Sequence, residues 1–278
     1  MATPEAPLRE ILKSISFTRL PLRHIEPFFV PEPITVPRLY IYGNNQTKGG
    51  PSGCVLPTYD IECLRALAVL RFAKYRFDVA HTAEPNASPD GKLPYLLLPD
   101  GTALRAAEIA SHLEQSGHSL PDCPLVGELA YRTMVERSLA PAVEYMAWVD
   151  PVGFEAVGDA RYLGGYPSLI RYLLGWIKSS RVAASVRCGL PEYGAALDGD
   201  VLTENALRAL DSLLALLGDG DYLAGAPSLL DAHAAACLNV LLEAPLKCPL
   251  RSALLGPDSK YKPLADYALR LLDKHLST

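Results

Sequence analysis

The sequence has 278 residues, of which 49% are hydrophobic and 21% charged, and its formal net charge at pH 7 is −5. This composition supports a sizeable buried interior and excludes disordered, collagen-like and coiled-coil proteins. The acidic balance provides no basic field for a phosphate backbone, so nucleic acid is not an expected partner. The longest stretch without charges or strong helix breakers, residues 232–242, is shorter than the ~20 apolar residues that span a bilayer. With no spanning segment and no overall basic face, attachment to a membrane is expected to come from a protein partner.

The cysteines and histidines form no recognisable ligand pattern. The cysteines show neither a CxxC pair nor Cys/His zinc-module spacing, and no secretory signal precedes them, which favours free thiols in a reducing compartment. They stand at positions 54, 63, 123, 188, 237 and 248. His112 and His118 are six residues apart, which does not place them on one helix face. We therefore predict no metal and no cofactor.

Residues 1–37 are interpreted as a proline-rich N-terminal arm. Its basic residues among apolar ones resemble a mitochondrial presequence, but Glu5 and Glu10 argue against a transit peptide, which is poor in acids. The prolines between Pro21 and Pro37 favour extended backbone. Phe28 and Phe29 either fold back onto the protein's own groove or anchor to another protein, and the sequence leaves both open.

The next segment, residues 38–120, alternates strand and helix patterns. Residues 38–43 (RLYIYG) indicate a strand, and a helix capped by Thr58 follows. A second strand is expected at residues 76–80, and a hairpin at 95–98 and 102–104 turns at Asp100-Gly101. A helix over about 105–117 ends this α/β unit.

From residue 121 to the end, only helical periodicity occurs. Five helices are expected. The first runs from residue 127 and has a kink at Pro141, and the second runs from residue 167 to a loop at 187–199. The third ends in an αL cap at Gly218, the fourth begins at Ser228, and the fifth covers residues 262–276. At the fourth helix the Ser228 hydroxyl and the Asp231 carboxylate can form a capping box. That capping role also accounts for Asp231 beside His233 without catalysis.

Two motifs make this organisation similar to the glutathione transferase fold. Residues 92–95 (KLPY) precede the hairpin, and residues 228–231 (SLLD) open a helix in the all-helical half. The resemblance implies a thioredoxin-like domain followed by a helical bundle domain, with Pro94 as a structural cis-proline. A trans proline opening an edge strand is the alternative.

Shorter segments resemble the metaxin family. These are residues 56–60 (LPTYD), 88–94 (SPDGKLP), 117–120 (GHSL), 160–162 (ARY) and 166–167 (YP), the last three being similar to the second metaxin paralogue and its fungal receptor-subunit counterpart. The resemblance covers about residues 38–276. It implies a peripheral subunit on the cytosolic face of the mitochondrial outer membrane, within the sorting and assembly machinery. The implied partners are a membrane-embedded barrel subunit, a second metaxin-like subunit and β-barrel precursors, which the protein would bind through their β-signal.

The glutathione site that an active transferase needs is incomplete in this sequence. Alignment on Ile109 places Arg105-Ala106 where an acid-Ser pair should bind the γ-glutamyl group, so a carboxylate and a hydroxyl are missing. Four other side chains could act as nucleophiles. Tyr40 and Tyr42 lie in a strand of the buried type, and Ser52 and Cys54 lie deep in a glycine-rich loop.

We therefore predict no catalytic residues and a non-enzymatic receptor and scaffold. The alternatives are a divergent glutathione transferase and a soluble assembly domain with the same fold.

Overall fold

The protein is described as a computed structural model covering residues 34–43, 56–82, 88–121, 123–157, 168–189 and 198–276. Most of the N-terminal arm, with Phe28 and Phe29, lies outside these ranges, as do Ser52 and Cys54. The chain divides into one unit over residues 1–33 and a second over residues 34–278. All of the described structure belongs to the second unit.

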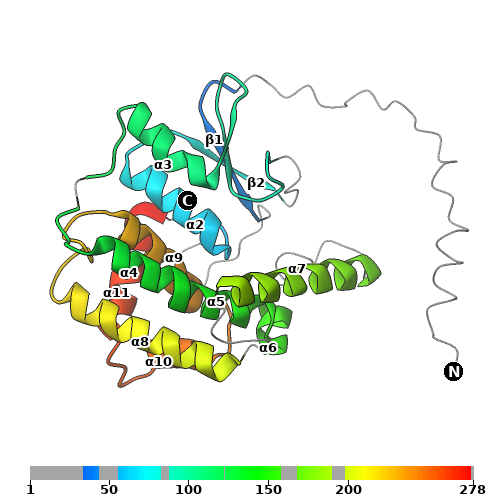
Figure 1. The fold of residues 1–278 in the computed structure, drawn as a ribbon, viewed down its shortest axis with the longest axis vertical. Coiled ribbons are helices and arrows are strands. Elements are labelled where there is room, and N and C mark those ends of the chain that lie inside the picture. Colours follow the sequence, from blue (N-terminus) through cyan, green and yellow to red (C-terminus); the bar gives the residue numbers. More distant parts are fainter. Residues whose placement is uncertain are drawn as a thin grey trace, which may run out of the picture. The chain divides into compact units, whose positions relative to one another are not determined.

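A four-stranded sheet with order β2-β1-β3-β4 organises the first part of this unit (Figure 1). The strands are β1 (Arg38–Tyr42), β2 (Asp78–Thr82), β3 (Tyr95–Leu97) and β4 (Ala103–Arg105). β1 pairs with β2 in parallel and with β3 antiparallel, and β3 pairs antiparallel with β4. Leu39 and Ile41 alternate into the core from β1, as the side-chain period of two requires. The second strand begins two residues later than expected, at Asp78.

The parallel β1–β2 connection runs through α2 (Ile61–Phe72), a helix buried along most of its length. Its N-cap is Asp60, whose Oδ1 accepts a hydrogen bond from the Cys63 amide at 3.0 Å. The expectation that Thr58 caps this helix was wrong. Thr58 Oγ1 instead accepts from the Asp60 amide at 3.1 Å, so its hydroxyl stabilises the turn that leads into the helix. After β4 the chain continues into α3 (Ala106–Gln115).

The elements in the described residues after α3 are all helical (Figure 1). They are α4 (Glu128–Met134), a π-helical segment (Val135–Leu139), α5 (Ala140–Trp148), α6 (Pro151–Gly153), α7 (Ser168–Gly189), α8 (Gly199–Leu217), α9 (Leu229–Glu243), α10 (Pro249–Leu255), α11 (Lys262–Leu271) and a second π-helical segment (Leu272–Leu276). None of the helices in the described ranges is both long enough and apolar enough to cross a bilayer.

Two details of this half differ from the sequence expectation, and the kink expected at Pro141 stays a prediction. Pro141 is the second residue of α5 and directly follows the π-helical segment, where the Ala140 amide donates to the Val135 carbonyl. α7 extends to Gly189, into the region expected to be a loop. Gly218 follows α8 with φ +49° and ψ −126°, which is a positive φ but not the expected αL conformation.

α9 forms the centre of the core. It packs against α2 from the sheet part and against α4, α10 and α11 from the helical part. Buried residues of both parts belong to one continuous hydrophobic cluster. The expected order, an α/β unit followed by helices, is confirmed, while the division at residue 120 remains a prediction.

Candidate functional site

Pro94, which the sequence predicts to be a structural cis-proline, lies directly before β3. The Leu93–Pro94 peptide bond is cis. The next residue, Tyr95, stacks on Tyr40 of β1 with ring centroids 4.7 Å apart and nearly parallel planes. Burial raises the pKa of the Tyr95 hydroxyl, and the neighbouring Tyr40 acts in the same direction. A tyrosine with a raised pKa holds its proton more firmly, which is the opposite of what a nucleophilic phenolate requires.

The N-terminus of α3 is closed by the chain's own side chains. The Arg105 amide donates a hydrogen bond to Glu108 Oε2 at 2.9 Å, and the Arg105 guanidinium forms an ion pair with the same carboxylate. These contacts lower the pKa of Glu108 to about 2, so it is ionised at neutral pH. Ala106, the first helical residue, has no hydroxyl. The N-terminus of α3, which could otherwise bind a carboxylate of a ligand, is therefore already occupied by the carboxylate of Glu108.

Of the remaining nucleophile candidates, the structure describes Tyr40 and Tyr42. Tyr40 is stacked on Tyr95, and Lys178 Nζ lies 5.4 Å from the centroid of the Tyr42 ring. Ser52 and Cys54 lie outside the described residues. Among the described residues, no group of three or more His, Cys, Asp or Glu side chains is arranged to hold a metal ion.

An acidic cluster that the sequence reading missed joins α2 to α5. Burial raises the pKa of Glu144 to about 7, and the negative charges of Asp60 and Glu62 add to this effect, while Lys178 opposes it. Burial also raises the pKa of Glu62, although its partner Arg65 acts in the opposite direction. No local pattern in the sequence indicates this cluster, because Glu144 is distant in sequence from Asp60 and Glu62.

The capping residues of α9 build a buried polar centre. Asp231 accepts hydrogen bonds from Ser228 Oγ at 2.7 Å, the Leu223 amide at 2.8 Å and the Tyr267 hydroxyl at 2.7 Å. Its own amide donates to Ser228 Oγ at 3.2 Å. With three internal donors, this carboxylate tethers α9 to α11 and to the preceding loop.

His233, two residues further on, is also buried. Its Nδ1 lies 3.2 Å from Glu136 Oε1, which by itself would favour the charged ring. Burial and the positive charges of Arg65 and Arg132 prevail and lower the pKa of His233 to about 3. The ring is therefore neutral at physiological pH, and Asp231 is bonded elsewhere, so this pair is not an acid-base site.

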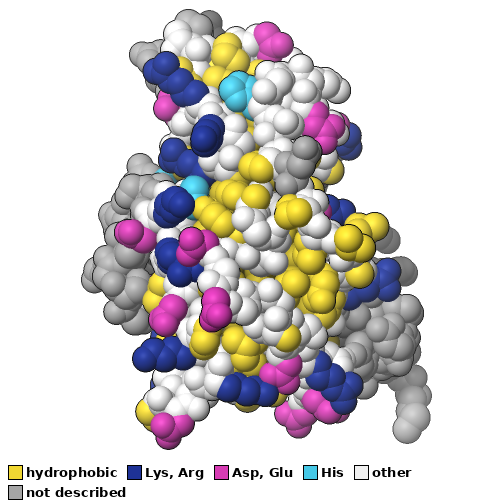
Figure 2. Space-filling model, turned by 90° about the vertical axis from the view of Figure 1, so that its left-hand side faces the viewer, with side chains coloured by type: hydrophobic (Ala, Val, Ile, Leu, Met, Phe, Trp, Pro, Cys, Tyr) yellow, Lys and Arg dark blue, Asp and Glu magenta, His cyan; other side chains and the backbone are white. Residues whose placement is uncertain are grey.

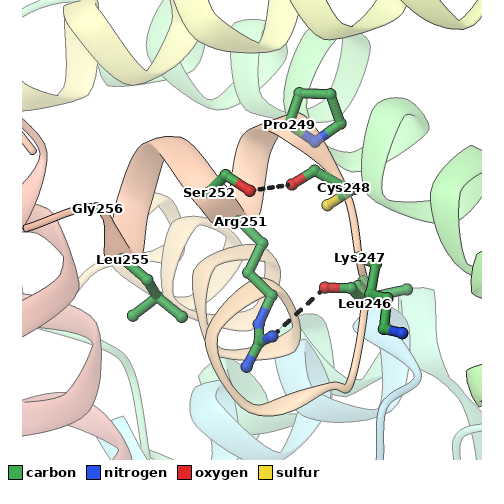
Figure 3. A pocket seen from close by; sticks show the side chains of 8 residues that line it. All are labelled: Leu246, Lys247, Cys248, Pro249, Arg251, Ser252, Leu255 and Gly256. Atoms are coloured by element: carbon green, nitrogen blue, oxygen red, sulfur yellow. Dashed lines mark hydrogen bonds between the residues drawn. The ribbon is translucent and has the colours of Figure 1, made fainter.

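A hollow of about 640 Å³ lies around α10 (Figure 3). Its polar groups mainly satisfy the local backbone: the Arg251 guanidinium donates to the carbonyls of Leu246 and Leu242 at 3.4 and 3.3 Å, and Ser252 Oγ donates to the Cys248 carbonyl at 3.2 Å. Figure 3 shows Arg251 turned back toward the loop that precedes α10. This geometry offers no converging set of donors for a ligand.

Comparison with known proteins places this architecture. Residues 63–178 match the Tom37 family, described as outer mitochondrial membrane transport complex protein. The chain is 27% identical over 208 residues to a metaxin-1 homologue of Caenorhabditis briggsae and 25% identical over 203 residues to metaxin-1 of Mus musculus, covering 70% of this chain in both cases. Over this region the chain is similar to the metaxins.

Metaxin-3 of Xenopus laevis gives a similar match, with 28% identity over 200 residues and 69% of this chain covered. The matches of this metaxin-like chain span 64% of the length of each of these three relatives. The resemblance to the metaxin family expected from the short motifs is confirmed. The finer resemblance to the second metaxin paralogue stays a prediction, since these relatives are named metaxin-1 and metaxin-3.

Solved structures confirm the fold class. A β-etherase from Sphingobium sp. strain SYK-6 matches the metaxin-like chain with a TM-score of 0.52 and 16% identity, covering 86% of this chain and 99% of that one. A glutathione transferase from Phanerochaete chrysosporium matches with a TM-score of 0.52 and 13% identity, covering 88% of this chain and 100% of that one. At these identities the likeness concerns the fold alone: a thioredoxin-like part followed by a helical part.

Proposed function

We propose that this metaxin-like chain is a non-enzymatic receptor and scaffold subunit of the machinery that sorts and assembles β-barrel proteins at the mitochondrial outer membrane. The observation that carries the proposal is the match of residues 63–178 to a family described by its place in an outer-membrane transport complex. The chain would be peripheral on the cytosolic face, docked on a membrane-embedded barrel subunit beside a second metaxin-like subunit.

The cargo would be the β-signal of precursor barrels. A β-signal is an amphipathic strand with unpaired backbone groups, which a receptor can hold by pairing at a sheet edge or in an apolar groove. In the strand order β2-β1-β3-β4, the outer strands are β2 and β4. β2, with five residues, offers the longer edge for a strand of this kind.

The competing function is a divergent glutathione transferase. Arg105 and Glu108 at the start of α3 argue against it, because their ion pair stands where the γ-glutamyl group would need a carboxylate and a hydroxyl. We expect no retention on immobilised glutathione and no conjugation activity. Turnover that requires glutathione and is abolished by changing Tyr40, Tyr42, Ser52 or Cys54 would overturn the scaffold proposal.

A pull-down in mild detergent tests the proposal directly. The full chain should co-purify with an outer-membrane barrel protein, and recovery without any such protein would contradict it. A third possibility, a soluble assembly domain, predicts a cytosolic fraction in cell fractionation and no enrichment with mitochondria.

The N-terminal arm is proposed to contribute to this binding. Prolines restrict the unbound segment and so lower the entropy lost on docking, and aromatic residues dominate interface energies. Deletion of residues 2–37 should weaken co-purification while leaving the thermal melt nearly unchanged, and Phe28→Ala with Phe29→Ala should reproduce much of that loss. If the deletion instead removes the cooperative melt, the arm is part of the protein's own core.

A further inference from the structure

Helix α7 has an inner side fixed to the protein and an outer side exposed to solvent. On the inner side, Lys178 Nζ lies 5.1 Å from the Trp148 ring centroid and 5.4 Å from that of Tyr42, so the helix is held against α5 and the end of β1. Val182 and Val186 are buried in the same helix. The position of α7 is therefore set by its inner contacts, independently of its outer face.

The outer face carries large apolar side chains. Tyr172 is 71% and Trp176 63% exposed, and Leu173 and Ile177 are exposed as well. Leu173, Trp176 and Ile177 follow Tyr172 by one, four and five residues, so the four side chains form one continuous patch over two helical turns. Exposed apolar residues usually occur singly, and a contiguous patch of this kind marks a surface that meets another phase or molecule.

The charge of this segment is of one sign. Between Asp159 and Glu192 the sequence has no acidic residue, although the whole chain has a net charge of −5. The cationic residues of α7 are Arg171, Lys178, Arg181 and Arg187. Arg181 and Arg187 are exposed, and Arg181 follows Ile177 by one helical turn, on the side of the apolar patch. By contrast, the face in Figure 2 mixes cationic and anionic side chains.

We propose that α7 lies on the surface of an anionic phospholipid bilayer, with Tyr172, Leu173, Trp176 and Ile177 at the level of the headgroups and Arg181 and Arg187 against the lipid phosphates. An interfacial helix has an apolar face with Trp among aliphatic residues together with Arg or Lys, and its binding combines apolar burial with attraction to anionic lipid. Trp and Tyr in particular favour the membrane–water interface.

The charge pattern favours lipid over a protein partner for this face. A bilayer surface presents negative charge over its whole extent, so it can match both outward cations of α7, Arg181 and Arg187. A protein interface of the same chain would more commonly pair charges of both signs. The inference goes beyond the proposed function, since it concerns lipid contact and requires neither the barrel subunit nor a precursor.

The full-length protein can be tested with vesicles of phosphatidylcholine alone and of phosphatidylcholine mixed with phosphatidylserine. We expect flotation with the mixed vesicles only, and a decrease of binding as salt is raised. The chain has only two tryptophans, Trp148 and Trp176, and Trp148 is buried. In Trp148→Phe, the emission of Trp176 should shift to shorter wavelength when mixed vesicles are added. In the wild-type protein the same vesicles should protect the exposed tryptophan from iodide quenching, which covers the case that Trp148→Phe does not fold.

Matched variants separate α7 from the rest of the surface. Arg181→Gln with Arg187→Gln should lower vesicle binding about 30-fold, which corresponds to about 1 kcal/mol for each cation near an anionic surface. The control Arg208→Gln removes an exposed arginine of α8 and should leave binding close to wild type. Tyr172→Ser with Trp176→Ser should lower binding several-fold, and Leu255→Ser, a control at a half-exposed leucine of α10, should not.

Several outcomes would overturn the inference. Absence of binding to the mixed vesicles, or equal losses in the α7 variants and their controls, would contradict it. So would α7 variants that keep vesicle binding and lose only the barrel protein in a pull-down, because the face would then be a protein contact. Vesicle binding with no barrel protein recovered would leave this inference standing and defeat the proposed function, so the two failures are distinguishable.

Discussion

Helices α7 and α9 distribute polar and apolar residues in opposite ways. α9 buries every residue from Leu230 to Glu243, including Asp231, His233, Asn239 and Glu243. α7 exposes Tyr172 and Trp176, aromatic residues of the kind that usually fill a core. The hydrophobic effect alone would reverse both arrangements, so each helix carries residues selected by something other than core burial.

The difference shows which residues are structural and which face outward. Asp231 has three internal donors and ties α9 to its neighbours, so its polarity is used within the fold. Trp176 is held on a helix whose position other residues determine. Stability measurements should therefore respond strongly to polar changes in α9 and weakly to aromatic changes in α7.

The largest effect is expected for Asp231→Ala. The substitution leaves the Tyr267 hydroxyl, Ser228 Oγ and the Leu223 amide without their buried acceptor, and the free energy of unfolding should fall by roughly 3–5 kcal/mol. Asp231→Asn keeps the shape and part of the acceptor capacity and should lose less. Chemical denaturation measures both, and equal stability of Asp231→Ala and wild type would refute a structural role for this carboxylate.

A pH dependence is expected from Glu144. Its pKa is about 7 in the folded protein against 4.5 for an ordinary glutamate, so between these values the folded state binds more protons than the unfolded state. Stability conferred by protonated Glu144 is thus present at low pH and is lost as the pH rises from about 4.5 to 7. Glu144→Gln cannot ionise and should be more stable than wild type by at most about 3 kcal/mol above pH 7, with the difference vanishing near pH 4.5. Unfolding curves of the two proteins that stay parallel across this range would contradict the prediction.

Asn239 should respond in the opposite direction to Asp231. It is fully buried, and neither its Nδ2 nor its Oδ1 has a hydrogen-bond partner among the described residues. Replacing such a group with an apolar one of similar size removes a desolvation cost, so Asn239→Leu should raise the free energy of unfolding by about 1–2 kcal/mol. Asn239→Ala is the control for lost packing volume. A clear loss in Asn239→Leu would mean that the amide has a partner it needs.

The sequence predicted the elements whose signals are local. The strand at β1 and the capping box at Ser228 follow from residues within a few positions of one another. The expected fold class came from the order of the elements and from the resemblance of residues 92–95 and 228–231 to the glutathione transferase fold. Thr58 and Asp60 are both good cap residues, and the sequence could not tell that the Thr58 hydroxyl would stabilise the turn before the helix. α10 is too short, at seven residues, for a periodic pattern to reveal it.

The features that depend on distant contacts were not accessible in this way. The acidic cluster requires α2 and α5 to meet, and the exposure of Trp176 requires knowing which side of α7 faces the core. The net charge of −5 also concealed the cationic segment around α7, because a sum over the chain averages out a local excess. Replacement of the acid-Ser pair by Arg105-Ala106 was visible from alignment, but the closing of that position by Glu108 was not.

The smallest effect on stability is expected for Tyr172→Ser with Trp176→Ser. Both side chains are mostly exposed, so removing them takes little from the core, and the free energy of unfolding should stay within about 0.5 kcal/mol of wild type. Leu238→Ala in α9, a fully buried position, provides the contrast and should cost about 2–5 kcal/mol. If the α7 variant instead loses stability comparable to Leu238→Ala, the aromatic residues pack against the protein itself. The contrast between the two helices would then disappear, because α7 would have no outward apolar face left for any surface to meet.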